Sequence, residues 1–284
     1  MLLSTSNFPM NRKMSAEESV RMIAEAGFDA VDLDLTNLSR DPNEPFLRST
    51  YLSDARRLRS VGDDLGIVFN QSHAPFQTKD IGDPFTEQFA ATIVRSVEIA
   101  VEMNIPIIVM HQIAFEPVTR DEVQRNYEFL NSLVPKIRGS GVKIAIENTR
   151  RYYGPHRNLV PGATSYAESF KEFMQELDPE YFTCCVDVGH CGLVGEDTVH
   201  MIRTLGHDLV KALHIQDNDS VKDSHLLPFM GSLDIHAIMS ALKEIQYDGD
   251  LTFEISFSRV PVELYPASLR YMENIGRYLM TLLK

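Results

Sequence analysis

Short apolar runs alternate along the chain with longer segments in which apolar residues recur every three or four positions. The short runs are rich in Val and Ile and almost continuously hydrophobic, which is typical of strands buried on both faces of a parallel sheet. The longer segments have the period of amphipathic helices. The pattern predicts strands at 1–6, 30–35, 66–73, 106–111, 142–147, 182–187, 209–215 and 250–255.

A helix is expected after each predicted strand. The first, at 15–27, opens with Ser15 and Glu18 in capping-box spacing and ends at Gly27, a residue typical of helix C-termini. The others are expected at 49–62, 84–103, 119–139, 165–177, 197–205, 234–245 and 262–283. Eight strand–helix pairs predict a single α/β domain, a (β/α)8 TIM barrel over residues 1–284. A doubly wound sheet is the alternative, but residues 4–11 lack the glycine-rich turn common after its first strand.

Composition narrows the classes of protein to consider. A formal net charge of −13 argues against a nucleic-acid partner, because phosphate binding normally needs a basic surface. No apolar run reaches the roughly 20 residues that span a bilayer, and the N-terminal segment lacks the features of a signal peptide. Three cysteines, two of them adjacent, do not suggest a disulfide framework. We therefore expect a cytoplasmic protein without a membrane partner.

Barrel enzymes carry their chemistry at the C-terminal ends of the strands, and here six consecutive predicted strands end in or near His, Asp or Glu. Each such residue alone is compatible with a helix cap or a hydrogen-bonded loop residue. Together they predict a divalent metal site, because buried carboxylates are costly unless a cation compensates them. The strand-end residues are His73, His111, Glu147, Asp187, His214 and Glu254, and the adjoining loops add His190, Asp223 and His225.

Four of these residues come from four successive strands and are expected to converge on one ion. Three carboxylates and one imidazole suit Mn²⁺, Mg²⁺, Co²⁺ or Fe²⁺, with Zn²⁺ also open. The remaining side chains are expected to orient these ligands, to contact substrate or to bind further metals. The four are Glu147, Asp187, His214 and Glu254; the remaining five are His73, His111, His190, Asp223 and His225.

Several of these segments carry a family resemblance. The segments AIENT (145–149), DVGH (187–190), LHIQDND (213–219) and FEI (253–255) resemble, in this order, the xylose isomerase-like barrel superfamily. The segment DSHLLPFMGSLDI (223–235) resembles a loop of its isomerase and epimerase-like members. The superfamily includes sugar and sugar-phosphate isomerases and epimerases, and apurinic endonucleases of the endonuclease IV type. The resemblance spans nearly the whole chain and implies the barrel fold without identifying a substrate.

The ketose 3-epimerase branch holds one metal between two glutamates, an Asp and a His. The resemblance assigns these ligands to Glu147, Asp187, His214 and Glu254. It also implies that the two glutamates exchange the substrate proton, through a metal-stabilised enediolate, and that His190 contacts a substrate hydroxyl. This branch often carries an Arg six residues after the strand-seven His, where this chain has Ser220.

The endonuclease branch holds three zinc ions with nine ligands and cleaves abasic DNA. The resemblance places a counterpart of every ligand in this chain, at His73, His111, Glu147, Asp187, His190, His214, Asp223, His225 and Glu254. Phe76 is the candidate for a stacking wedge. The loop after the second strand, however, has Arg40 beside Asp41 and Glu44, where a DNA-binding protein would need cations.

Residues 150–157 form the most basic and aromatic segment expected at this rim. They are compatible with a solvated loop, or with a lid in which Arg150, Arg151, His156 and Arg157 hold a phosphate or carboxylate of the substrate. Cys191 is either a soft metal ligand or a small buried filler.

The function expected from the sequence is a metal-dependent isomerase or epimerase. Its small-molecule substrate would be a sugar, sugar phosphate, sugar acid or polyol, with Glu147 and Glu254 as base and acid and His190 on a substrate hydroxyl. The alternative is a zinc phosphodiesterase of the endonuclease IV type. Dehydration of a cyclic polyol and assembly into a homo-oligomer stay open.

Overall fold

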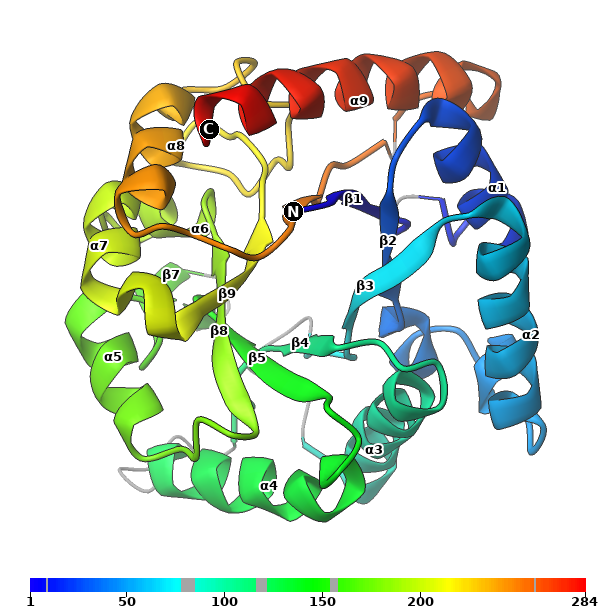
Figure 1. Ribbon diagram of the computed structural model, residues 1–284. Coiled ribbons are helices and arrows are strands. Elements are labelled where there is room, and N and C mark those ends of the chain that lie inside the picture. The colour runs from blue at the N-terminus through cyan, green and yellow to red at the C-terminus, as the bar shows by residue number, and fades with distance from the viewer. Residues whose placement is uncertain (9, 78–84, 116–121, 154–157, 258) are drawn as a thin grey trace.

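The computed structural model describes residues 1–8, 10–77, 85–115, 122–153, 158–257 and 259–284 (Figure 1). Within these ranges, eight parallel strands form one sheet in the order β10-β1-β2-β3-β4-β5-β8-β9. Each coincides with a strand predicted from the sequence, with ends that differ by a few residues at most. The strands are β1 (Leu3–Ser6), β2 (Ala30–Asp34), β3 (Val68–His73), β4 (Ile107–Met110), β5 (Lys143–Glu147), β8 (Phe182–Asp187), β9 (Val210–His214) and β10 (Leu251–Phe253).

The sheet closes on itself between its first and last strands. β1 pairs with β10, with Leu3 opposite Leu251. At the other junction Ile215, directly after β9, forms a parallel bridge with Phe253 of β10. The N–H of Ile215 also donates a hydrogen bond to the carbonyl of Thr252 at 2.8 Å. The predicted (β/α)8 barrel is therefore confirmed, and the open doubly wound sheet is excluded.

Helices surround the strands on the outside of the barrel (Figure 1). The first confirms the predicted capping box: the Ser15 side chain accepts from the Glu18 N–H, the Glu18 side chain accepts from the Ser15 N–H, and Gly27 ends the helix at φ 102°. No helix in the described ranges is both long and apolar enough to cross a bilayer. The longer helices are α1 (Ala16–Ala26), α2 (Tyr51–Leu65), α3 (Glu87–Glu102), α4 (Glu122–Ile137), α5 (Ala167–Gln175), α7 (Thr198–Leu209), α8 (Ile235–Glu244) and α9 (Tyr265–Leu282).

The connections after the barrel strands contain short elements that the sequence pattern does not predict. Strands β6 (Arg150–Tyr153) and β7 (Asn158–Pro161) form an antiparallel pair after β5. A one-turn helix α6 (His190–Leu193) follows β8. The 3₁₀ turns are η1 (Thr36–Ser39) and η2 (Pro45–Leu47) after β2, and η3 (Val262–Leu264) after β10. All of them lie at the end of the barrel where enzymes of this fold build their active sites.

The interior of the barrel has an apolar side and a polar side. The apolar side is formed by small side chains of β4, β5, β8 and β9, which are Val109, Ala145, Cys185 and Ala212. On the side of β1, β3 and β10, the Ser4 hydroxyl donates to Asn70 Oδ1 at 2.7 Å, and Asn70 Nδ2 donates to Thr252 Oγ1 at 3.3 Å. Asp32 of β2, opposite Ser6 of β1, is also fully buried. A carboxylate in such a place is costly unless a cation partners it.

Candidate metal centre

The nine side chains singled out in the sequence lie at one end of the barrel. Four of them end their strands, two follow a strand directly, and three lie in the connections beyond β8 and β9. Parallel strands bring their carboxyl ends to the same rim, so residues far apart in the chain become neighbours. In chain order these residues are His73, His111, Glu147, Asp187, His190, His214, Asp223, His225 and Glu254.

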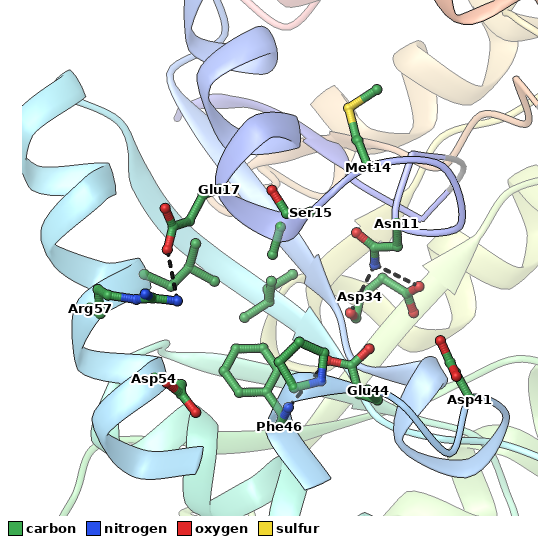
Figure 2. Close-up of a pocket in the computed structure, with 14 residues that line it drawn as sticks. Asn11, Met14, Ser15, Glu17, Asp34, Asp41, Glu44, Phe46, Asp54 and Arg57 are labelled. Atoms are coloured by element: carbon green, nitrogen blue, oxygen red, sulfur yellow. Dashed lines mark hydrogen bonds and ion pairs between the residues drawn. The ribbon is translucent and has the colours of Figure 1, made fainter. Parts of the chain in front are cut away.

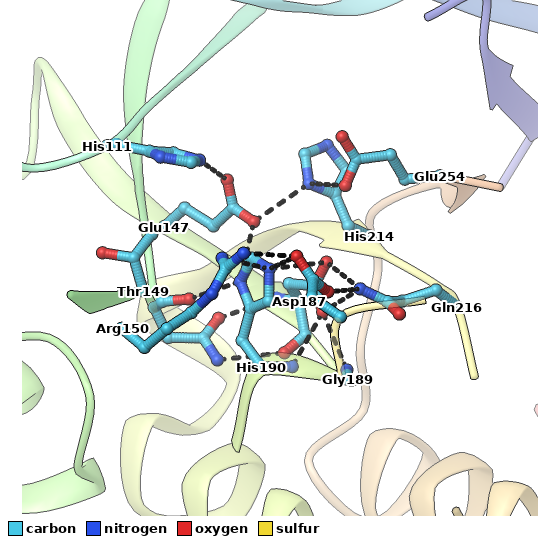
Figure 3. Close-up of polar contacts among 12 residues, drawn as sticks. His111, Glu147, Thr149, Arg150, Asp187, Gly189, His190, His214, Gln216 and Glu254 are labelled. Carbon is cyan, nitrogen blue, oxygen red and sulfur yellow. Dashed lines mark hydrogen bonds and ion pairs between the residues drawn. The ribbon is translucent and has the colours of Figure 1, made fainter. Parts of the chain in front are cut away.

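The structure brings the four predicted ligands of the first ion together. Glu147, Asp187, His214 and Glu254 each offer one ligand atom, and these atoms lie within 4.8 Å of one another. Figure 3 shows the carboxylates of Glu147 and Glu254 on either side of one ring nitrogen of His214. The distances from His214 Nδ1 are 3.3 Å to Glu147 Oε1 and 3.4 Å to Glu254 Oε2. Three carboxylates and one imidazole within this radius form a pocket rich in oxygen ligands, as Mn²⁺, Mg²⁺, Co²⁺ or Fe²⁺ prefer.

The two glutamates of this group differ in their pKa. Burial by itself raises the pKa of a carboxyl, but for Glu147 the neighbouring imidazoles of His111 and His214 outweigh it and hold the pKa well below its usual range. For Glu254 burial prevails over the imidazoles of His214 and His225, and the pKa is raised. In the chain itself Glu147 is therefore the more firmly ionised of the two glutamates.

Asp187 is held in one orientation by donors from two directions. Its Oδ1 accepts hydrogen bonds from the backbone N–H groups of Gly189 at 2.7 Å and His190 at 3.0 Å. From the other side, Gln216 Nε2 donates to Oδ1 at 3.2 Å and Oδ2 at 3.1 Å. Asn148 Oδ1 accepts from the backbone N–H of Asp187 at 2.7 Å. Asp187 therefore caps the turn after β8, and its carboxylate is held in one orientation, as a metal ligand would need to be.

Asp32 supports the ring of His214 from the inside of the barrel. Its Oδ2 lies 3.4 Å from His214 Nε2, the nitrogen that points away from Glu147 and Glu254. Both residues are fully buried, and among the described residues neither oxygen of Asp32 accepts a hydrogen bond. A carboxylate behind the second nitrogen of a metal-binding imidazole is a recurrent feature of metal sites, because it orients the ring. The buried Asp32 carboxylate thus fits an ion on the opposite side of His214.

His73 and His111 form a second group around Glu147. The Nε2 atoms of His73 and His111 lie 3.3 and 2.9 Å from Glu147 Oε2. His73 Nδ1 contacts the carbonyl of Ala74 at 2.8 Å, so it carries the proton there and a neutral ring turns its Nε2 lone pair to the carboxylate. Two acceptors that face each other need a proton or a metal ion between them. Burial lowers the pKa of His111 to about 4, more than Glu147 raises it.

His190, Asp223 and His225 form a third group, again with ligand atoms within 4.8 Å of one another. Here burial lowers the pKa of His225, but the carboxylates of Asp223 and Glu254 outweigh it and raise the pKa to about 10. His190 Nδ1 donates to the carbonyl of Asn148 at 2.9 Å, while its Nε2 lies 2.8 Å from Arg150 Nη1. Both ring nitrogens of His190 thus have partners within the chain.

The segment 150–157, expected to be a loop or a lid, begins as the ribbon strand β6. Arg150 extends toward His190 and Asp223, and Arg151 pairs with Glu122 at 2.6 Å. His156 and Arg157 lie outside the described residues. Cys191 is fully buried, and burial raises the pKa of its thiol to about 12, so the filler interpretation describes it better than the ligand interpretation.

Three residues that support the site are not predicted from the sequence. Asp32 lies in the middle of an apolar run, and its charge was a signal that the buried strand required a partner. Asn148 and Gln216 carry no charge, and nothing in their spacing marks them as contacts of Asp187. Their places follow from the turn after β8 and from the bulge between β8 and β9, which only the three-dimensional structure defines.

Comparisons with known proteins agree with this architecture. The sequence pattern of the xylose isomerase-like TIM barrel family matches residues 20–275. An uncharacterized protein of Methanocaldococcus jannaschii is 25% identical over 213 residues, which cover 72% of this chain and 70% of that protein. A D-tagatose 3-epimerase-like protein has the same fold with a TM-score of 0.73 and 19% identity, over 100% of this chain and 98% of the other. The IOLI protein, solved with a zinc atom, has a TM-score of 0.73 at 16% identity, over 97% of this chain and 98% of its own. The chain belongs to the xylose isomerase-like TIM barrel family.

Proposed function

We propose that the chain is a divalent-metal-dependent isomerase or epimerase of a sugar, sugar phosphate, sugar acid or related polyol. The observation that carries the proposal is the convergence of four ligand atoms within 4.8 Å at the ends of adjacent barrel strands. These are contributed by Glu147, Asp187, His214 and Glu254. The solved structures named above are less than 25% identical and support the fold, so the substrate class rests on the chemistry of this group.

The four residues would hold one divalent ion, which supplies a positive charge to the carbonyl and neighbouring hydroxyl of a bound sugar. That charge acidifies the C–H next to the carbonyl. Glu147, the more firmly ionised glutamate, would remove this proton as the base, and Glu254, whose raised pKa favours its protonated form, would return one as the acid. Asp187 and His214 hold the pocket in shape, because Gln216 and Asp32 fix their orientations.

His190 stands beside the proposed position of the sugar. Its Nδ1 lies 3.3 Å from Glu147 Oε1, so it adjoins the proposed base directly. Arg150 contacts its other ring nitrogen, and the guanidinium beside the His190 ring would present N–H donors to a substrate hydroxyl. In this proposal His190 keeps the substrate contact that the sequence predicts for it and shares it with Arg150.

The test is exchange of a substrate proton with solvent. The Mn²⁺-loaded protein is incubated with a panel of ketoses in D₂O, and deuterium next to the carbonyl is followed by NMR. We expect labelling with the wild type, and a loss of about 10²-fold or more in Glu147→Gln and Glu254→Gln. Glu244→Gln is the matched control, because Glu244 pairs with Arg203 at 2.8 Å on the exposed surface. A substrate converted without any label, or full exchange by Glu147→Gln, would overturn the proposed mechanism.

A zinc phosphodiesterase acting on abasic DNA is the second candidate, because the nine ligands of such a site lie in three groups here. The groups are His73, His111 and Glu147; Glu147, Asp187, His214 and Glu254; and His190, Asp223 and His225. Three ions in these places would clamp a phosphodiester and activate a water. Cleavage of an abasic-site oligonucleotide by the zinc-loaded protein, with no proton exchange on ketoses, would establish this candidate instead.

The charges around the rim favour the sugar over DNA. A cavity of about 160 Å³ lies beside the end of β2 (Figure 2), and carboxylates from several elements line it. A phosphate backbone would be repelled there. The carboxylates are Glu17, Asp34, Asp41, Glu44 and Asp54; Arg57 also lines the cavity and pairs with Glu17 at 3.0 Å.

The aromatic residue predicted as a DNA wedge is also engaged in the chain. The rings of Phe76 and His111 stack with their centroids 4.3 Å apart. The guanidinium carbon of Arg40 also lies over the Phe76 ring, 4.3 Å from its centroid. These contacts use the aromatic surface that a base would need for stacking. We therefore retain the isomerase or epimerase as the first proposal.

A further inference from the structure

The third histidine–carboxylate group has the features of a built cation site. His190 Nε2 and His225 Nε2 lie 3.6 and 3.3 Å from Asp223 Oδ2. The Nδ1 atoms of the two rings contact backbone carbonyls, at 2.9 Å to Asn148 and 2.8 Å to Glu254. These contacts use the Nδ1 atom of each ring as a donor and leave Nε2 as the ring atom that faces Asp223. Once Nε2 carries no proton, two imidazole nitrogens and a carboxylate are a donor set for a transition-metal ion.

A side chain of the protein already supplies a positive charge to this group. Arg150 Nη1 lies 2.8 Å from His190 Nε2, and Arg150 Nη2 donates to Asp223 Oδ2. These are the same two atoms that would ligate an ion. The side chains of Arg150 and Asp223 are each 13% exposed, and a guanidinium stays ionised at every relevant pH. Figure 3 shows Arg150 lying across the ring of His190.

The guanidinium and a metal ion compete for one lone pair. A neutral imidazole whose Nδ1 carries the proton has a single acceptor position, at Nε2. If Arg150 donates to this position, His190 cannot ligate an ion there. An ion would also meet the positive charge of Arg150 at contact distance, which costs free energy in a largely buried place.

The backbone directs Arg150 into the group. Arg150 begins β6 opposite Pro161 of β7, directly after Thr149. The Thr149 N–H donates to Thr164 Oγ1 at 3.3 Å, and the Ser165 hydroxyl donates to the Thr149 carbonyl. Successive side chains of a strand point to opposite faces, and Arg151 accordingly turns away to Glu122. The arginine thus leaves an anchored segment close to the end of β5.

We infer that Arg150 replaces a metal ion between His190, Asp223 and His225, so that the chain binds one ion fewer than its ligand set would permit. The inference rests on the proposed metal-dependent function, because it lowers the number of ions that the three ligand groups could hold from three to two at most. The guanidinium of Arg150 then supplies the N–H donors of this group to substrate oxygen atoms, which suits a polyhydroxylated substrate.

Zinc content per chain tests this inference. The apoprotein is equilibrated with Zn²⁺, freed of excess ion, and analysed by elemental mass spectrometry. We expect Arg150→Met and Arg150→Gln to hold one more zinc per chain than the wild type. Asp223→Asn, combined with Arg150→Met, should return the content to the wild-type value. Arg151→Met is the matched control and should leave it unchanged, because Arg151 pairs with Glu122 outside the group. Circular dichroism confirms that each variant is folded.

The result separates this inference from the proposed function. An unchanged zinc content in both folded Arg150 variants would overturn the inference, whatever the wild type binds. If the wild type binds no zinc and Arg150→Met binds one, the inference stands and the proposed metal-dependent function fails. If neither binds zinc, both fail.

Discussion

The Oδ2 atom of Asp32 lies 3.4 Å from Nε2 of His214, inside a closed barrel where neither side chain reaches solvent. The opposite nitrogen of the same ring faces Glu147 and Glu254. His214 therefore connects a carboxylate in the barrel interior with the proposed metal ligands at the rim. A negative charge at this distance favours the ring orientation and the proton position that leave Nδ1 available to an ion.

Replacing Asp32 should weaken metal binding without removing a ligand. We expect Asp32→Asn to raise the Kd for Co²⁺ or Zn²⁺ about 10- to 100-fold, because the supporting charge behind His214 is lost. Competition with a chromophoric chelator measures the Kd. Asp34→Asn is the control, since Asp34 contacts Asn11 and the Thr36 N–H rather than His214. Equal affinities of Asp32→Asn and the wild type would show that Asp32 does not support the site.

The strands and their terminal residues could be predicted because most of the barrel strands are short apolar runs, rich in Val and Ile, that stop abruptly at a polar residue. His73, Glu147, Asp187 and His214 indeed end their strands in the structure. The hydrophobic pattern of the sequence does not predict the ribbon β6–β7, because a two-stranded ribbon outside the barrel buries no continuous face and so produces no hydrophobic period. Helix α7 runs to Leu209, past its predicted end at 205, across a break at Gly206 with φ 71° and ψ −177°.

The supporting contacts of the site could not be predicted, because they depend on register and on turns. Whether Asp32 faces the barrel interior depends on the pairing of β2 with β1 and β3, where a bulge follows Val31. The direction of Arg150 depends on the ribbon that was missed. A single sequence therefore indicates which charged residues reach the rim. The residues that these side chains contact are defined only by the folded barrel.

An ion at the proposed metal site should raise the stability of the protein. An ion that binds only the folded chain adds about 2.7 kcal/mol to the free energy of unfolding at 100 times its Kd. We expect Mn²⁺ to raise the Tm of the chelator-treated wild type. Asp187→Asn should lack this shift, because a ligand at the centre of the first group is neutralised. The measurement is thermal unfolding followed by circular dichroism, and an equal shift in both proteins would place the ion elsewhere.

Gly189 should tolerate no side chain. A Cβ at this position would lie 2.5 Å from Asn218 Nδ2 and 2.6 Å from Gln216 Cδ. Gly189→Ala should therefore displace Gln216 from Asp187, destabilise the fold by about 1–3 kcal/mol and weaken metal binding. Urea unfolding and metal titration measure the two effects. Gly162→Ala is the control, with its nearest contacts at 3.4 Å on the flexible side chain of Arg151. If Gly189→Ala lost stability but kept the metal affinity of the wild type, Gly189 would matter for packing and not for the orientation of Asp187.

An ion pair between Asp29, just before β2, and Arg277 of the last helix should make the stability of the protein depend on pH. Arg277 of α9 donates to Asp29 Oδ2 at 2.7 Å and Oδ1 at 2.9 Å, and Asp29 Oδ2 also accepts from the Leu3 N–H at 2.8 Å. The hydrogen bonds from Arg277 lower the pKa of Asp29 below its ordinary value of 3.8. Because the folded pKa is the lower one, the stabilisation is complete above pH 3.8 and is lost as the pH falls through the folded pKa.

Because solvent screens this partly exposed pair, Asp29→Asn should destabilise the protein by about 1 kcal/mol at about pH 7, and by clearly less at about pH 3. Urea unfolding of both proteins at the two pH values gives the difference. Glu102→Gln is the control: Glu102 pairs with the exposed Arg56 at 2.6 Å, and exposed pairs contribute about 0–1 kcal/mol. If the loss in Asp29→Asn were as large in acid as at neutral pH, it would arise from packing around Asp29 and not from its charge.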